Sequence, residues 1–141
     1  MVGYLYAVLA AGTWGLVYAL EQRVLRDFSP ITVAFTCALC GAVALAPFAI
    51  GQISSVLISA RTSSLSWLLL VVVGIVAAIA NVLITTSIRE LSAPVAAVLE
   101  VSYPIFVCIA GYLLFGFKLS PQFALGAVLI MAGAGVIVVK T

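Results

Sequence analysis

The sequence predicts an all-α integral membrane protein with five transmembrane helices, and three observations predict this fold class. Of the 141 residues, 66% are hydrophobic and only 7% are charged, and the mean hydropathy is +1.39. A water-soluble domain of this length could not bury so much apolar surface in one core. The apolar residues also gather in runs of about 20, the length that a helix needs to cross a bilayer. Residues 1–141 are therefore expected to form a single transmembrane domain.

The five predicted spans follow one another with short polar breaks between them. They cover residues near 3–20, 31–50, 66–87, 93–116 and 121–139. The first run lacks the basic start of a cleaved signal peptide, so we expect it to remain as a span. Because the breaks are short, sequential helices are expected to be neighbours.

Three of the spans begin with a serine that is followed within two residues by a proline. A serine hydroxyl can accept a hydrogen bond from a free N–H at a helix start, and a proline in the first turn loses no hydrogen bond. These signals predict helix starts at Ser29-Pro30, at Ser92 with Pro94, and at Ser120-Pro121.

The titratable residues are few and exclude several classes of function. The 6 Lys and Arg against 4 Asp and Glu give a formal net charge of +2, too little for a nucleic-acid surface. There is no His, which removes the commonest general base and metal ligand. Cys37 and Cys40 form a CxxC without a second ligand pair, so we interpret them as buried small hydrophobes. We expect no metal, no cofactor and no enzymatic activity.

The charges at the helix ends bear on orientation. Glu21, Asp27 and Glu90 lie there among arginines and are expected to be solvated. Lys and Arg concentrate on the cytoplasmic side of membrane proteins, but their bias here is only four against two, which leaves insertion in both orientations open. The two groups are Arg23, Arg26, Arg89 and Lys140 on one side, and Arg61 and Lys118 on the other.

Small residues recur at a four-residue spacing in several spans, which lets helix backbones approach closely. In the last span, Gly126 and Gly133 lie one heptad apart, and we expect them to contact a helix of the same chain or of a second copy. We interpret the other stripes as packing faces as well: Ala7, Ala11 and Gly15, then Ala38, Ala42 and Ala46, then Gly74 and Ala78.

The stretch AAVLEVSYPIFV, residues 96–107, places Glu100 in an otherwise apolar run. Glu100 lies seven residues into the fourth predicted span, about 10 Å below the membrane surface at a helical rise. An acidic residue near a helix centre costs roughly 2.5–3.5 kcal/mol on insertion scales. Trp14, Thr36 and Asn81 reach a comparable depth in three other spans, so the sequence predicts a polar layer shared by four helices.

The residues that follow Glu100 predict a helix kink beside it. Pro104 cannot donate a hydrogen bond to the carbonyl four residues earlier, which is that of Glu100, and Tyr103 shares the helix face of Glu100 and offers a hydroxyl. Two readings stay open: Glu100 only joins helices, or it binds ligands. We favour the second, because intramembrane carboxylates are mostly functional. On this second reading, the residues that bind the proton and the substrate are Glu100, Tyr103, Trp14, Asn81 and Thr36.

Two segments, TWGLVYALEQRVLRDFSPITVAF and SIRELSAPVAAVLEVSYPIFVCIAGYLLFGFKLSPQFALGAVLIMAGAGVIV, resemble the EamA-like domain of the drug/metabolite transporter superfamily. The shared features are a Trp-Gly in the first helix, a Ser-Pro opening the second, an internal proline and Phe-Gly in the fourth, and a Gly-rich last helix. The resemblance covers nearly the whole chain. It departs at Phe117, where the family commonly has a glutamate, and at Glu100, since many members place an acidic residue directly before the proline.

The resemblance implies a ten-helix fold made of two inverted five-helix repeats around a central cavity, of which this chain is one half. Inverted repeats place the binding site at their interface near the midplane. The simplest partner is a second copy, which makes a homodimer; an antiparallel arrangement, as in the related small multidrug resistance proteins, stays open.

The function expected from this resemblance is a secondary transporter of a small metabolite or of an amphipathic or cationic compound, with proton coupling at Glu100 as a hypothesis. Two alternatives stay open, a non-transporting membrane interaction subunit and a lipid-carrier flippase of the same fold. The expected partners are a small solute, lipid and the second copy, without nucleic acid. We expect the chain to pass several times through the cell membrane, the inner or plasma membrane of a prokaryote.

Overall fold

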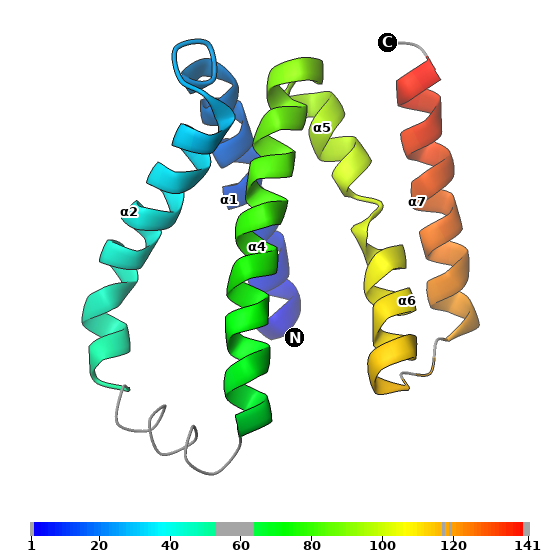
Figure 1. Cartoon of the computed structure of the whole chain (residues 1–141). Helices are drawn as coiled ribbons and strands as arrows, with labels where there is room; N and C mark the ends of the chain where they lie inside the picture. The colour runs from blue at the N-terminus through cyan, green and yellow to red at the C-terminus, as the bar shows by residue number, and fades with distance from the viewer. Residues whose placement is uncertain (1, 53–63, 117, 119, 140–141) are drawn as a thin grey trace.

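The computed structural model is helical throughout and describes residues 2–52, 64–116, 118 and 120–139, with no strand among them. Figure 1 shows long helices that converge at one end of the molecule and spread apart toward the other. The helices are α1 (Val2–Val24), α2 (Pro30–Ile50), α4 (Ser64–Leu91), α5 (Ala93–Glu100), α6 (Tyr103–Phe115) and α7 (Pro121–Val139). The predictions that involve Arg61, Phe117 and Lys140 lie outside the described residues.

Four helical segments are long and apolar enough to cross a membrane: α1, α2, α4, and α5 with α6 taken together over Ala93–Phe115. These segments confirm the first four predicted spans as apolar helices of membrane length. The helix α7 is apolar over Pro121–Ile137 and is shorter than the others. A fifth crossing therefore stays a prediction.

Two of the helices run past the predicted ends of their spans. The helix α1 continues to Val24 instead of ending near residue 20, and α4 covers Ser64–Leu91 instead of 66–87. Glu, Gln and Arg are good helix formers, so polar side chains after an apolar run need not end the helix. Burial of Tyr18, Glu21 and Leu25 also fixes the last turn of α1 against its neighbours.

The predicted serine caps are confirmed at two helix starts and wrong at the third. Ser29 Oγ accepts a hydrogen bond from the Thr32 N–H at 3.2 Å, and Ser120 Oγ accepts one from the Phe123 N–H at 3.2 Å. The Ser92 side chain makes no cap. The N–H of Ala93 instead donates to Gln22 Oε1 at 3.0 Å, so a side chain from the end of α1 caps α5.

The buried core lies at the end where the helices converge. Its members come from α1, the α1–α2 turn, α2, α4 and α5: Tyr18, Leu25, Val33, Ile88, Ala93 and Ala96. Thr85 is fully buried beside them and donates its hydroxyl to the Asn81 carbonyl at 2.8 Å. The α1–α2 turn, the α4–α5 turn and the end of α7 share this side of the molecule (Figure 1), so Arg23, Arg26 and Arg89 lie at one end as predicted.

Some helices that follow one another in the chain pack closely, and others do not. The helix α2 packs against α4, α4 against α5, and α5 against α7, whereas α1 packs mainly on α5 and α4. Within the described ranges α1 makes no comparable contact with α2, although the two follow each other in the chain. The two helices still face each other across a cavity, where Cys37 Sγ of α2 lies 3.9 Å from Glu21 Oε1 of α1, so they are neighbours without close packing.

The glycines of the predicted packing faces have open space beside them among the described residues. A Cβ placed at Gly15, Gly74, Gly126 or Gly133 would meet no heavy atom within 4 Å outside its own stretch of helix. The stripe of α1 lines a cavity instead. Contact of Gly126 and Gly133 with a helix of the same chain or of a second copy therefore stays a prediction.

Candidate functional site

The predicted kink in the fourth span is a full break in the helix. The helix α5 ends at Glu100 and α6 begins at Tyr103, with Pro104 in the first turn of α6. Hydrogen bonds from the Val101 N–H to the Ala97 carbonyl (3.1 Å) and from the Ser102 N–H to the Leu99 carbonyl (3.1 Å) close the end of α5. Because the proline ring clashes with the carbonyl four residues earlier and restricts the residue before it, the break falls directly after Glu100.

The carboxylate of Glu100 is held by Tyr18 of α1. The Tyr18 hydroxyl donates a hydrogen bond to Glu100 Oε2, and the ring of Tyr18 lies 5.7 Å from that of Trp14, at an interplanar angle of 56°. Tyr103, which the sequence analysis placed beside Glu100, is 60% exposed. Sequence reasoning missed Tyr18, although it follows Trp14 by four residues and so shares its helix face.

A cavity of about 660 Å³ lies beside this carboxylate, between α1, the break and α7. Its volume falls in the range of sites for small molecules. Among the described residues that line it, Glu100 alone carries a charge. Small residues of α1 form one wall, and the remaining lining is aromatic or apolar apart from Glu100. The residues are Ala7, Ala10, Ala11, Trp14, Gly15, Tyr18, Ala97, Glu100, Val101, Tyr103, Pro104 and Ile130.

The structure brings together part of the predicted polar layer. Glu100, Tyr103 and Trp14 line the same cavity, whereas Asn81 and Thr36 are not among its lining residues. Thr36 donates its hydroxyl to the Thr32 carbonyl at 2.8 Å and lines a different cavity, between α1 and α2. Asn81 lies half-buried on α4. Depth along a span does not say which way a side chain points around the helix, and packing decides that.

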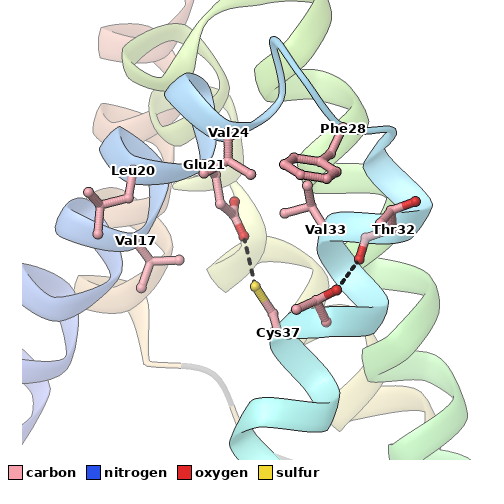
Figure 2. A pocket seen from close by; sticks show the side chains of 9 residues that line it. Val17, Leu20, Glu21, Val24, Phe28, Thr32, Val33 and Cys37 are labelled. Atoms are coloured by element: carbon pink, nitrogen blue, oxygen red, sulfur yellow. Dashed lines mark hydrogen bonds between the residues drawn. The ribbon is translucent and has the colours of Figure 1, made fainter.

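Glu21 is buried, and the expectation that it is solvated is wrong. Only 6% of the residue is exposed. Figure 2 shows Glu21 facing Cys37 across the second cavity, with Cys37 Sγ 3.9 Å from Glu21 Oε1. Glu21 is buried because α1 does not end before it. The helix continues to Val24, and Glu21 lies one turn after Tyr18, which is also buried. The expectation for Asp27 is confirmed, since it is exposed and lies 4.0 Å from exposed Arg23, and Glu90 is exposed too.

The cysteines are free among the described residues, and two of them are exposed. Cys37 and Cys40 are exposed on α2, and Cys108 is intermediate. Their interpretation as buried residues is therefore wrong within this chain, because α2 packs on α4 along one side only. The described residues hold no cluster of three or more potential metal ligands.

Comparison with known families decides what kind of membrane protein this is. Residues 1–139 match the EamA-like transporter family. The chain belongs to this family. Comparisons with curated proteins and with solved structures found no match. The EamA-like chain is thus a multi-pass membrane protein of a transporter family, as the resemblance of its first and fourth spans predicted.

In this EamA-like chain the geometry around Glu100 allows two kinds of chemistry. The Tyr18 hydroxyl engages one carboxylate oxygen, which fixes the group beside the cavity and leaves Oε1 able to take a proton or a cationic donor. Interrupted helices at membrane depth are tolerated where the backbone faces protein or a water-filled space. The break in the fourth span lines the cavity through Val101, Tyr103 and Pro104.

Proposed function

We propose that this EamA-like chain is one half of a secondary transporter that carries a small amphipathic or cationic solute. The single observation that supports it is the carboxylate of Glu100, placed at a helix break and lining a cavity of about 660 Å³. A solute with an apolar body contacts the aromatic and small side chains, and its charge meets Glu100. A proton competes for the same oxygen, so protonation and solute binding exclude each other.

The exposure of Glu100 within one chain favours a second copy. Glu100 is exposed in the single chain, and a carboxylate facing lipid near a helix centre costs roughly 2.5–3.5 kcal/mol. A second chain that covers the cavity removes the carboxylate from lipid. Two such carboxylates in one cavity repel each other, and a bound proton or cation lowers that repulsion.

The test of coupling is uptake of tetraphenylphosphonium, a compact amphipathic cation, into proteoliposomes under an imposed pH gradient. Glu100→Gln removes the exchangeable proton and is expected to abolish gradient-driven uptake. Glu90→Gln is the matched control, because Glu90 is exposed at the end of α4 and is expected to keep wild-type flux. Coupling at Glu100 is contradicted if Glu100→Gln still accumulates the cation.

A second candidate function, a non-transporting interaction subunit, is favoured by one observation. Among the described residues, a Cβ at Gly126 or Gly133 of α7 would meet nothing within 4 Å. On this reading α7 docks onto a different membrane protein, and Glu100 only joins α5 to α1 through Tyr18. Purification in mild detergent separates the two functions, because a half-transporter yields a homodimer and an interaction subunit yields a monomer.

A further inference from the structure

A second cavity of about 450 Å³ lies between α1 and α2 (Figure 2), and it shares no lining residue with the Glu100 cavity. Its walls are mostly apolar, and Glu21 is the one charged residue among the described residues that line it. The volume is large enough for a small organic molecule. The lining consists of Val17, Leu20, Glu21, Val24, Phe28, Thr32, Val33, Thr36 and Cys37.

The carboxylate of Glu21 is buried with one oxygen unpaired. Its Oε1 lies 3.9 Å from the thiol of Cys37, a weak donor. Its Oε2 is buried and has no hydrogen-bond partner among the described residues. An unsatisfied buried polar group is destabilising, and more so when it is charged. The site therefore lacks a donor for Oε2.

The other polar groups of the cavity do not supply that donor. The Thr36 hydroxyl donates to the Thr32 carbonyl at 2.8 Å. The Thr32 hydroxyl lies 2.8 Å from the hydroxyl of Ser29, at the start of the same helix. Both threonines are thus engaged within α2, which leaves Glu21 Oε2 as the acceptor that a ligand must satisfy.

The surroundings of Glu21 favour a ligand that carries a positive charge. An ionised carboxylate only accepts hydrogen bonds, so the ligand must bring the N–H or O–H group. The ring of Phe28 lines the cavity and can attract a cation through its face. The remaining apolar walls match an apolar body.

We infer that the cavity between α1 and α2 binds an organic ammonium ion with an apolar body, whose N–H donates to Glu21 Oε2. This site is separate from the Glu100 cavity and does not depend on transport through it. Two sources provide the same chemistry: a free amphipathic amine, or the ethanolamine headgroup of a lipid that reaches in from the bilayer.

Cys37 provides a reporter for occupancy, because its thiol lines the cavity next to Glu21. A chain with Cys40→Ser and Cys108→Ser, in phosphatidylcholine vesicles, is alkylated with N-ethylmaleimide with or without 4-phenylbutylamine. At ten times the concentration for half-protection, labelling of Cys37 is expected to slow about tenfold by mass action. The neutral control compound is 4-phenylbutanol. The matched control chain keeps only Cys40, which is exposed on α2 outside the cavity.

Three variants test whether protection of Cys37 arises from binding at this site. For each variant, the labelling rate with the amine is divided by the rate without it, so that a change in the reactivity of the thiol itself cancels. Glu21→Gln is expected to abolish protection of Cys37. Leu20→Trp fills the cavity but keeps the Glu21 carboxylate, and it is also expected to abolish protection. If Glu21→Gln aggregates, Leu20→Trp still tests whether the amine binds in this cavity. Glu100→Gln is expected to keep protection, which separates this site from the coupling carboxylate of the proposed function.

The inference is overturned if the alcohol protects Cys37 as well as the amine does, or if protection survives in both Glu21→Gln and Leu20→Trp. Vesicles that contain phosphatidylethanolamine, without added amine, distinguish the two sources of the ammonium group. If Cys37 is labelled more slowly in these vesicles than in phosphatidylcholine, and Glu21→Gln removes that difference, the lipid headgroup is an occupant of the site. Equal labelling in the two lipids assigns the site to free amines.

Discussion

At the scale of single residues, the site is organised by Tyr18. Its hydroxyl joins α1 to Glu100 at the helix break, and its ring contacts Trp14. Glu21 lies one turn further along α1, and its Oε2 is buried without a hydrogen-bond partner among the described residues. Neighbouring turns of α1 thus carry Tyr18, which binds the carboxylate of Glu100 on α5, and Glu21, whose own carboxylate lacks a partner for Oε2 among the described residues. We expect the carboxylate of Glu100 to be fixed in position and that of Glu21 to be open to a ligand.

Tyr18→Phe tests the contact that positions Glu100. The variant keeps the buried ring and removes the hydroxyl, so the change isolates one hydrogen bond to a charged group, which contributes about 1.5–3 kcal/mol. We expect the free energy of unfolding in detergent to fall by about that amount, measured by chemical denaturation. Tyr103→Phe is the control, because Tyr103 lines the same cavity but is 60% exposed. An equal loss in both variants would contradict a specific role for Tyr18.

At the scale of the elements, α5 depends on α1 at both of its ends. Gln22 caps its first N–H, and Tyr18 binds the carboxylate of its last residue, Glu100. The helix has only 8 residues, too few to be stable in isolation. It is therefore held by these contacts and by the burial of Ala93 and Ala96. A change in how α1 packs would move the break and Glu100 with it.

The cap of α5 can be tested by Gln22→Ala. Loss of a side-chain cap costs typically about 0.5–2 kcal/mol, and we expect a drop in thermal stability in detergent that corresponds to this range. Ser92→Ala is the comparison, since the Ser92 side chain makes no cap, and it should leave the midpoint nearly unchanged. If Ser92→Ala destabilised the chain more than Gln22→Ala, the assignment of the cap to α1 would be wrong.

At the scale of the whole molecule, the chain is closed at one end and open at the other. The core lies where the α1–α2 and α4–α5 turns converge (Figure 1). Among the described residues, the glycines of α1, α4 and α7 have open space beside them, and Glu100 is exposed beside its cavity. An isolated half-transporter is expected to have such a surface. The bias in Lys and Arg is small enough that the covering copy can insert the other way up.

Labelling of both termini from each side of the membrane tests this arrangement. Each terminus carries a short tag with one reactive cysteine, in a chain whose own cysteines are replaced by serine. An antiparallel homodimer predicts that an impermeant thiol reagent labels each terminus in about half of the chains, because the charge bias is weak. Labelling of one terminus alone would show a fixed orientation and remove the antiparallel homodimer.

The sequence by itself determined the class of protein, the helices and the family. Hydropathy and proline placement are local properties, so four apolar spans, two serine caps and a break next to Glu100 were predictable before any packing was known. Depth along the spans named Glu100, Trp14, Asn81 and Thr36 together, and of these only Glu100 and Trp14 line the same cavity.

Only the tertiary structure decided which side chains meet. Tyr18 and Gln22 find partners 82 and 71 positions away in the chain, at Glu100 and Ala93. Glu21 is buried beside Cys37 of the next helix, α2. Such contacts depend on how each helix is rotated and tilted against its neighbours. Hydropathy does not encode that rotation when the whole helix surface is apolar, because a membrane helix carries little contrast between the face toward lipid and the face toward protein.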